Sequence, residues 1–236
     1  ECIPDEMTQI RNILHKSRPG GVTPLTGHLR EIRSDIEVMA PTLRSEGKKV
    51  AVIIATDGIP TDEAGYISDS IREEFVSALR AFQNLPVWFV IRLCTDEEDI
   101  VTFYNEIDEQ LELEMEVIDD FMGEAAEVYE HNKWLNYALP LHRCREMGFH
   151  DHLFDLLDER TFMAGEVRDF CGLLFGCDNF EDLPDPSIDW NAFTKALKKL
   201  NDSEELHWNP MKKKATKWID LGQLDKIFGP KSCVIS

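Results

Sequence analysis

Two nearly continuous apolar runs constrain the fold of this chain more than any other feature. The first, "VAVIIA", lies in residues 49–55, and the second, "LPVWFVIRLC", spans residues 85–94. Strands that are apolar on both faces are typical of parallel sheets covered by helices. Between them, residues 68–83 carry apolar side chains at helical spacing. A strand, a helix and a second strand in this order predict an α/β fold with a parallel sheet.

Further elements are expected on both sides of this unit. Residues 5–16 have helical spacing, and a second helix is expected from Pro24 to a stop near Pro41, because proline disrupts a helix interior. A third helix is expected over residues 95–108 with Thr95 as its cap. Residues 113–119, "LEMEVID", alternate in polarity and predict an edge strand.

After residue 119 the pattern becomes mostly helical. The expected helical segments are 120–132, 134–147, 150–160, 165–175, 189–200 and 218–229. We therefore expect an α/β domain over residues 1–118, a helical extension over 119–229 and a short tail over 230–236.

Charge and cysteine content exclude several classes of protein. The 236 residues carry a net charge of −20, which disfavours nucleic acid, because phosphate binding needs clustered Lys and Arg. The six cysteines form no CxxC pair, as expected for reduced thiols in the cytoplasm.

No apolar run approaches the roughly 20 residues of a membrane-spanning helix. The start, "ECIPDEMTQI", has no initiator Met and resembles no targeting peptide, so we expect a fragment of a longer protein.

Oxygen donors gather in two segments. "PGGVTPLTGHL" (19–29) offers the hydroxyls of Thr23 and Thr26, and "ATDGIPTD" (55–62) offers the carboxylates of Asp57 and Asp62. Asp57 follows a buried strand, and ligands of parallel α/β sheets gather at the carboxyl ends of the strands. Hydroxyl and carboxylate oxygens suit Mg²⁺. The plainer alternative for Asp57 is a turn or cap residue after a strand.

The two segments, in this order and spacing, resemble the second and third loops of the metal-ion-dependent adhesion site (MIDAS) of von Willebrand factor type A (VWA) domains. The resemblance covers roughly residues 5–118 and implies a partial Rossmann-like VWA sheet. It implies that Thr23 is the hydroxyl ligand and Asp57 the carboxylate ligand, with Thr26 and Asp62 as neighbours. Val22 is a one-residue insertion relative to the family motif.

One part of the family pattern is missing. The Asp-x-Ser-x-Ser loop of the family has no counterpart here, and "SDSI" (68–71) lies after the third loop. The resemblance therefore implies Mg²⁺, or Mn²⁺ or Ca²⁺, only if an upstream loop supplies the remaining ligands.

What the resemblance implies about function is binding rather than catalysis. A partner protein would complete the metal shell with a carboxylate, giving a non-catalytic interaction or scaffold protein. The alternative is a VWA-type regulatory subunit of an ATPase or another enzyme complex. The sequence contains neither a nucleophile elbow nor a phosphate-binding loop, so no motif in it indicates an enzyme.

Two further segments invite hypotheses. "LHRCREMGFHDH" brings together His142, Cys144, His150 and His152, but the spacing matches no common zinc pattern, so structural or surface roles are favoured. The last four residues, "CVIS", form a prenylation box that predicts a farnesyl group on Cys233.

Residues 211–236 hold six Lys against two Asp, and a basic patch is the usual second signal for an anionic membrane. We expect peripheral attachment to the cytosolic face of a membrane. The alternative is a chance ending, with the lysines folded against the body of the protein.

Overall fold

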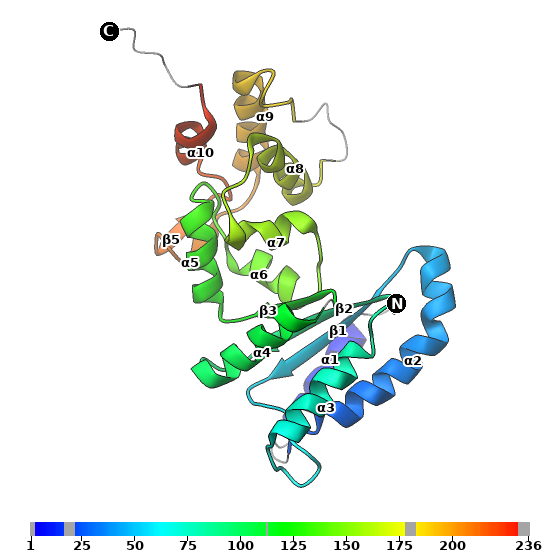
Figure 1. Ribbon diagram of the computed structural model, residues 1–236. Coiled ribbons are helices and arrows are strands. Elements are labelled where there is room, and N and C mark those ends of the chain that lie inside the picture. The colour runs from blue at the N-terminus through cyan, green and yellow to red at the C-terminus, as the bar shows by residue number, and fades with distance from the viewer. Residues whose placement is uncertain (1–2, 17–21, 112, 178–182, 231–236) are drawn as a thin grey trace.

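The computed structural model describes residues 3–16, 22–111, 113–177 and 183–230. Three strands form one parallel sheet in the order β1-β2-β3, namely β1 (Val50–Thr56), β2 (Val87–Leu93) and β3 (Met115–Ile118). Figure 1 shows this sheet between three helices on one side and the C-terminal helices on the other. The predicted mixed α/β class with a parallel sheet is confirmed.

One face of the sheet is covered by α2 (Leu25–Glu46), α3 (Asp69–Arg80) and α4 (Glu98–Gln110). Alternate strand residues point toward these helices, and cross-strand pairing aligns Val52 with Phe89 and Phe89 with Met115. These residues form one hydrophobic core with apolar side chains of all three helices, among them Leu29, Phe75, Leu79 and Tyr104.

The opposite face of the sheet contacts the C-terminal half of the chain. Trp88, Val90 and Ile118 are buried there, and the ring of His150 stacks on Trp88 with the ring centroids 3.6 Å apart. Gly148 has a φ of +82°, and an added Cβ would lie 2.9 Å from the Cβ of Ala51. Close approach to the sheet and a left-handed backbone therefore both require glycine at this position.

Two predicted helix boundaries are wrong. Helix α2 does not stop near Pro41 but continues through this exposed proline to Glu46. Its end is set instead by Gly47, in the left-handed region at φ +64°, with Lys48 N–H donating to Leu43 O. Thr95 does not cap α4, because it lies three residues before the helix begins at Glu98 and its hydroxyl accepts from the N–H of Glu97 instead.

The C-terminal half consists of six helices and a short hairpin within the described residues. The elements are α5 (Phe121–His131), α6 (Leu139–Glu146), α7 (His152–Glu159), α8 (Ala164–Phe175), α9 (Trp190–Ser203), β4 (His207–Asn209), β5 (Lys214–Thr216) and α10 (Leu221–Phe228). Their buried side chains form a second core around Trp134, Phe170 and Phe193, separate from the core of the α/β half.

The predicted helix 134–147 is wrong in its first part. Residues 134–136 pair with residues 218–220, since Asn136 N–H donates to Trp218 O and Asp220 N–H donates to Trp134 O. Helix α6 begins only at Leu139, with Pro140 in its first turn, where proline is favoured. The β4–β5 hairpin was likewise not expected in a helical extension.

The first helix, α1 (Ile3–Lys16), lies where residues 5–16 predicted it. Its apolar residues Met7, Ile10 and Ile13 are exposed. No helix among the described residues is long and apolar enough to cross a membrane.

Candidate metal site at the carboxyl edge of the sheet

Asp57 lies at the carboxyl end of β1 in a tight turn. The hydroxyl of Thr56 donates to Gly58 O at 3.0 Å and accepts from Gly58 N–H at 3.3 Å. The Tyr104 hydroxyl also donates to Gly58 O at 3.0 Å, and burial raises the pKa of Tyr104 to about 12, so this donor keeps its proton at neutral pH. The carboxylate of Asp57 is exposed and makes no hydrogen bond or ion pair with the described residues.

The loop that carries Thr23 is fixed against the loop that follows Asp57. Thr23 N–H donates to the Thr61 hydroxyl at 2.9 Å, and Thr61 N–H donates to Thr23 O at 3.0 Å. Val22 packs on Gly65, where an added Cβ would lie 2.7 Å from Val22 Cγ1. The structure therefore brings the two sequence segments together at one edge of the sheet.

The neighbouring candidates Thr26 and Asp62 differ in their surroundings. Thr26, in the first turn of α2, is buried, and its hydroxyl has no hydrogen-bond partner among the described residues. Oδ1 of Asp62 accepts from Ala64 N–H at 2.9 Å and from Tyr66 N–H at 2.8 Å. Asp62 therefore has a structural role in its own turn.

The oxygen types near this end of the sheet are those that a hard divalent cation accepts. Asp57 offers a carboxylate without a protein partner, and Thr26 offers an orphaned hydroxyl. Such oxygens are the ligands that Mg²⁺ and Ca²⁺ prefer. Cys233, the predicted lipid site, lies outside the described residues.

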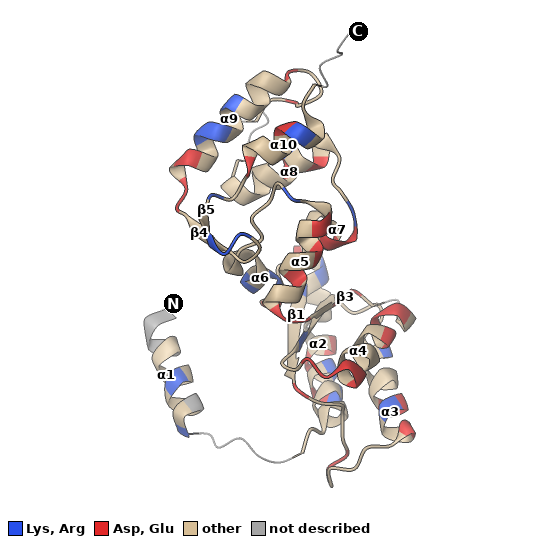
Figure 2. Ribbon diagram, turned by 90° about the vertical axis from the view of Figure 1, so that its left-hand side faces the viewer, with Lys and Arg blue, Asp and Glu red and all other residues tan. Residues whose placement is uncertain are grey.

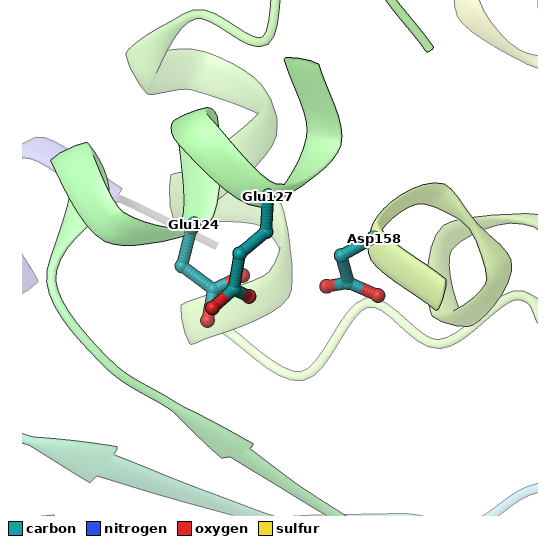
Figure 3. A group of neighbouring side chains, drawn as sticks. All are labelled: Glu124, Glu127 and Asp158. Carbon is teal, nitrogen blue, oxygen red and sulfur yellow. The ribbon is translucent and has the colours of Figure 1, made fainter. Parts of the chain in front are cut away.

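A second group of carboxylates was missed in the sequence. Glu124 and Glu127 of α5 and Asp158 of α7 bring one oxygen each to within 4.8 Å of one another, and Figure 3 shows their carboxylates turned toward a common space. The spacing of Glu124 and Glu127, three residues apart on one helix, was the only local signal, because Asp158 reaches the group through tertiary packing.

A buried guanidinium already neutralises part of this charge. Arg145 of α6 donates to Glu124 at 2.7 Å, to Asp158 at 2.9 Å and to Glu116 of β3 at 2.6 Å. Burial raises the pKa of Glu124 to about 7, although the charge of Arg145 opposes the shift. The cluster is therefore an ion-pair network that joins α5, α6 and α7 to the sheet.

The histidine-rich segment has packing contacts of its own. His142 is buried, with Nε2 3.4 Å from Glu146 Oε1 and Nδ1 3.5 Å from the Tyr137 hydroxyl. Burial lowers the pKa of His142, which favours the neutral ring. His150 stacks on Trp88, as described above, whereas the thiol of Cys144 is exposed.

Comparison with protein families, curated proteins and solved structures finds no match to this chain. The expected resemblance to VWA domains therefore depends on the motifs at residues 19–29 and 55–62 alone.

Proposed function

We propose that this chain is a non-catalytic protein-interaction module with a partial VWA-type, Rossmann-like sheet, whose carboxyl edge binds a divalent cation. The observation that carries the proposal is the exposed Asp57 carboxylate, without a protein partner, beside a Thr23 loop that reciprocal hydrogen bonds hold in place.

Asp57 and Thr23 would hold the cation, with the unpaired hydroxyl of Thr26 close in sequence to the second ligand. When bound, a cation with an open coordination position accepts a carboxylate from a partner protein. The protein's own contribution is to fix the two loops and to keep the Asp57 carboxylate accessible. The family pattern adds ligands from an Asp-x-Ser-x-Ser loop, which this sequence does not contain, so we expect weak cation binding by the chain alone.

Calorimetric titration with Mn²⁺ tests the proposal. We expect Asp57→Asn to abolish binding and Asp62→Asn to preserve it. The second variant removes the same charge from the same loop, and an amide oxygen can still accept the two turn hydrogen bonds.

The carboxylate cluster on α5 and α7 is the competing Mn²⁺ site, so Glu127→Gln is the second control. Binding that survives Asp57→Asn, or that Glu127→Gln abolishes, would contradict the proposal. So would an unsubstituted chain that binds no Mn²⁺.

A farnesyl tether at Cys233 is the second part of the proposed function, and it is supported by the sequence "CVIS". Expression in eukaryotic cells followed by membrane fractionation tests it. Cys233→Ser should move the protein from the membrane fraction to the cytosol, and equal partitioning of both forms would refute the tether.

A further inference from the structure

A pocket with a volume of about 280 Å³ lies beside the β4–β5 hairpin, far in the sequence from the Asp57 site. Its walls come from the 133–136 segment, from Asn201 of α9, from the hairpin, from Lys217, Ile219 and Asp220, and from Leu221 at the start of α10. This volume is slightly below the range of pockets that hold small molecules, roughly 300–1,000 Å³, so the pocket suits a small ligand.

The pocket is basic in an acidic protein. Four lysines line it, with Asp220 as the single acidic residue among its lining side chains: Lys133, Lys212, Lys214 and Lys217. The whole chain has a net charge of −20, and Figure 2 shows Lys and Arg on α9 and along the hairpin, whereas Asp and Glu gather on α4 and α7. Positive charges concentrated in one pocket attract an anion.

Two of the four lysines are already engaged by the protein. Lys212 Nζ pairs with Asp220 Oδ2 at 2.5 Å, and Lys217 Nζ donates to the backbone oxygens of Asp202 and Glu204. Within the described part of the chain, Lys133 and Lys214 form no ion pair, although Lys133 Nζ lies 6.0 Å from the centroid of the Tyr129 ring. Neither ammonium group is neutralised by a carboxylate, so both can pair with an anionic ligand.

One buried polar atom at the pocket, Oδ1 of Asn136, lacks a hydrogen-bond partner among the described residues. The side chain of Asn136 is 3% exposed, and its Nδ2 donates to His207 O at 3.2 Å. Its Oδ1 has no hydrogen-bond partner among the described residues, whereas the amide of Asn201 exchanges two hydrogen bonds with the backbone of Ile219. An unpaired buried acceptor favours a ligand that brings a donor.

The lining offers no stacking surface for a nucleobase. Trp134, the one aromatic residue of the pocket wall, is 0% exposed, and its ring packs against Phe162 and Phe170. Proteins that bind unpaired bases commonly stack them on aromatic side chains. The ligand is therefore better sought among phosphorylated compounds that carry hydroxyl groups instead of a base.

We propose that this pocket binds a phosphorylated polyol of the inositol phosphate class, either free or as a lipid headgroup. Its phosphates contact Lys133 and Lys214, and one of its hydroxyls donates to Asn136 Oδ1. The proposal is independent of the Asp57 site, and it assigns the lysines of the hairpin to a folded pocket rather than to a polybasic tail.

Calorimetry with inositol trisphosphate at physiological salt tests the pocket. We expect binding that falls at least tenfold in the Lys133→Ala, Lys214→Ala double variant. The matched control is Lys195→Ala with Lys199→Ala, which removes two exposed lysines of α9 that do not line the pocket. Unchanged melting temperatures for both double variants exclude misfolding as the cause.

Tripolyphosphate, which is highly charged but has no hydroxyl on carbon, should bind at least tenfold more weakly than inositol trisphosphate. Vesicles of phosphatidylcholine, with and without phosphatidylinositol bisphosphate, distinguish a lipid headgroup from a free ligand. The proposal would be overturned if the two double variants lost equal affinity for inositol trisphosphate, or if tripolyphosphate bound as tightly as inositol trisphosphate. It would also be overturned if the protein bound neither inositol trisphosphate nor the vesicles.

Discussion

Arg145 Nε lies 2.6 Å from Glu116 Oε1, and this contact joins helix α6 to the edge strand of the sheet. The same guanidinium reaches Glu124 and Asp158, and its side chain is 5% exposed. Three carboxylates from three elements therefore depend on one buried cation. This arrangement connects the two hydrophobic cores, which share no side chain.

Arg145→Ala should destabilise the fold by about 3–5 kcal/mol, because it leaves buried carboxylates without a counter-charge. Urea unfolding followed by circular dichroism measures the change. The control is Arg30→Ala, which removes an exposed pair with Glu74 and should cost less than about 1 kcal/mol. Equal losses in the two variants would show that the network adds nothing beyond a surface ion pair.

Glu124→Gln should alter how stability depends on pH. Burial raises the pKa of Glu124 in the folded protein to about 7 from its ordinary value of 4.5, so the folded carboxyl releases its proton at a higher pH than the unfolded one. The contribution of Glu124 to the free energy of unfolding therefore falls as the pH rises from 4.5 to 7. The glutamine of the variant does not titrate, so the variant does not lose this stability. Relative to the parent, the variant should gain about 2–3 kcal/mol across this window.

Glu166→Gln is the control for the pH experiment, since hydrogen bonds from Arg160 lower the pKa of Glu166. Its contribution is present above the unfolded pKa and is lost as the pH falls through the folded pKa. The difference between this variant and the parent should therefore stay constant from pH 5 to 7 in thermal melts. A flat profile for Glu124→Gln as well would contradict the raised pKa.

Gly148→Ala should destabilise more than Gly176→Ala. Both glycines have positive φ, at +82° and +67°, so alanine costs about 1 kcal/mol of backbone strain at either position. Only at Gly148 would the new methyl group also collide with Ala51, which should add at least about 1 kcal/mol. Equal urea-unfolding midpoints for the two variants would mean that the segment around Gly148 moves away from the sheet without a cost in free energy.

Pro41→Ala should stabilise the protein by about 1–3 kcal/mol. Pro41 lies inside α2 and cannot donate the hydrogen bond that an alanine there would make. Pro140→Ala is the comparison, because Pro140 is in the first turn of α6, where no such bond is lost, and little change is expected. Differential scanning calorimetry decides, and a lower melting temperature for Pro41→Ala would refute the expectation.

The elements with strong local signals could be predicted from the sequence. The apolar runs became β1 and β2, and the helix expected over residues 68–83 became α3. The segment at 134–138 could not be predicted, because its backbone is held by residues more than 80 positions away at 218–220. Long-range pairing overrode a helical pattern there.

The candidate site likewise has features that the sequence predicts and features that depend on tertiary structure. The position of Asp57 at the carboxyl end of β1 follows from the topology of a parallel sheet, whereas the approach of the Thr23 loop depends on its two hydrogen bonds with Thr61. The structural role of Asp62 depends on turn geometry, and the grouping of Arg145 with Glu116 and Asp158 depends on packing between the two halves. No spacing in the sequence carries that information.

Strand β1 has practical consequences for anyone who handles this protein. It forms an edge of the sheet within the described residues, and on the sheet face opposite α2, α3 and α4 its residues Ala51, Ile53 and Ala55 are exposed, Ile53 by 40%. An apolar edge strand is a template on which further copies can polymerise. Mutual repulsion between acidic surfaces opposes that encounter, and salt screens it over about 8 Å at physiological ionic strength. Concentrated stocks should therefore stay clear in dilute buffer and turn cloudy as salt is added.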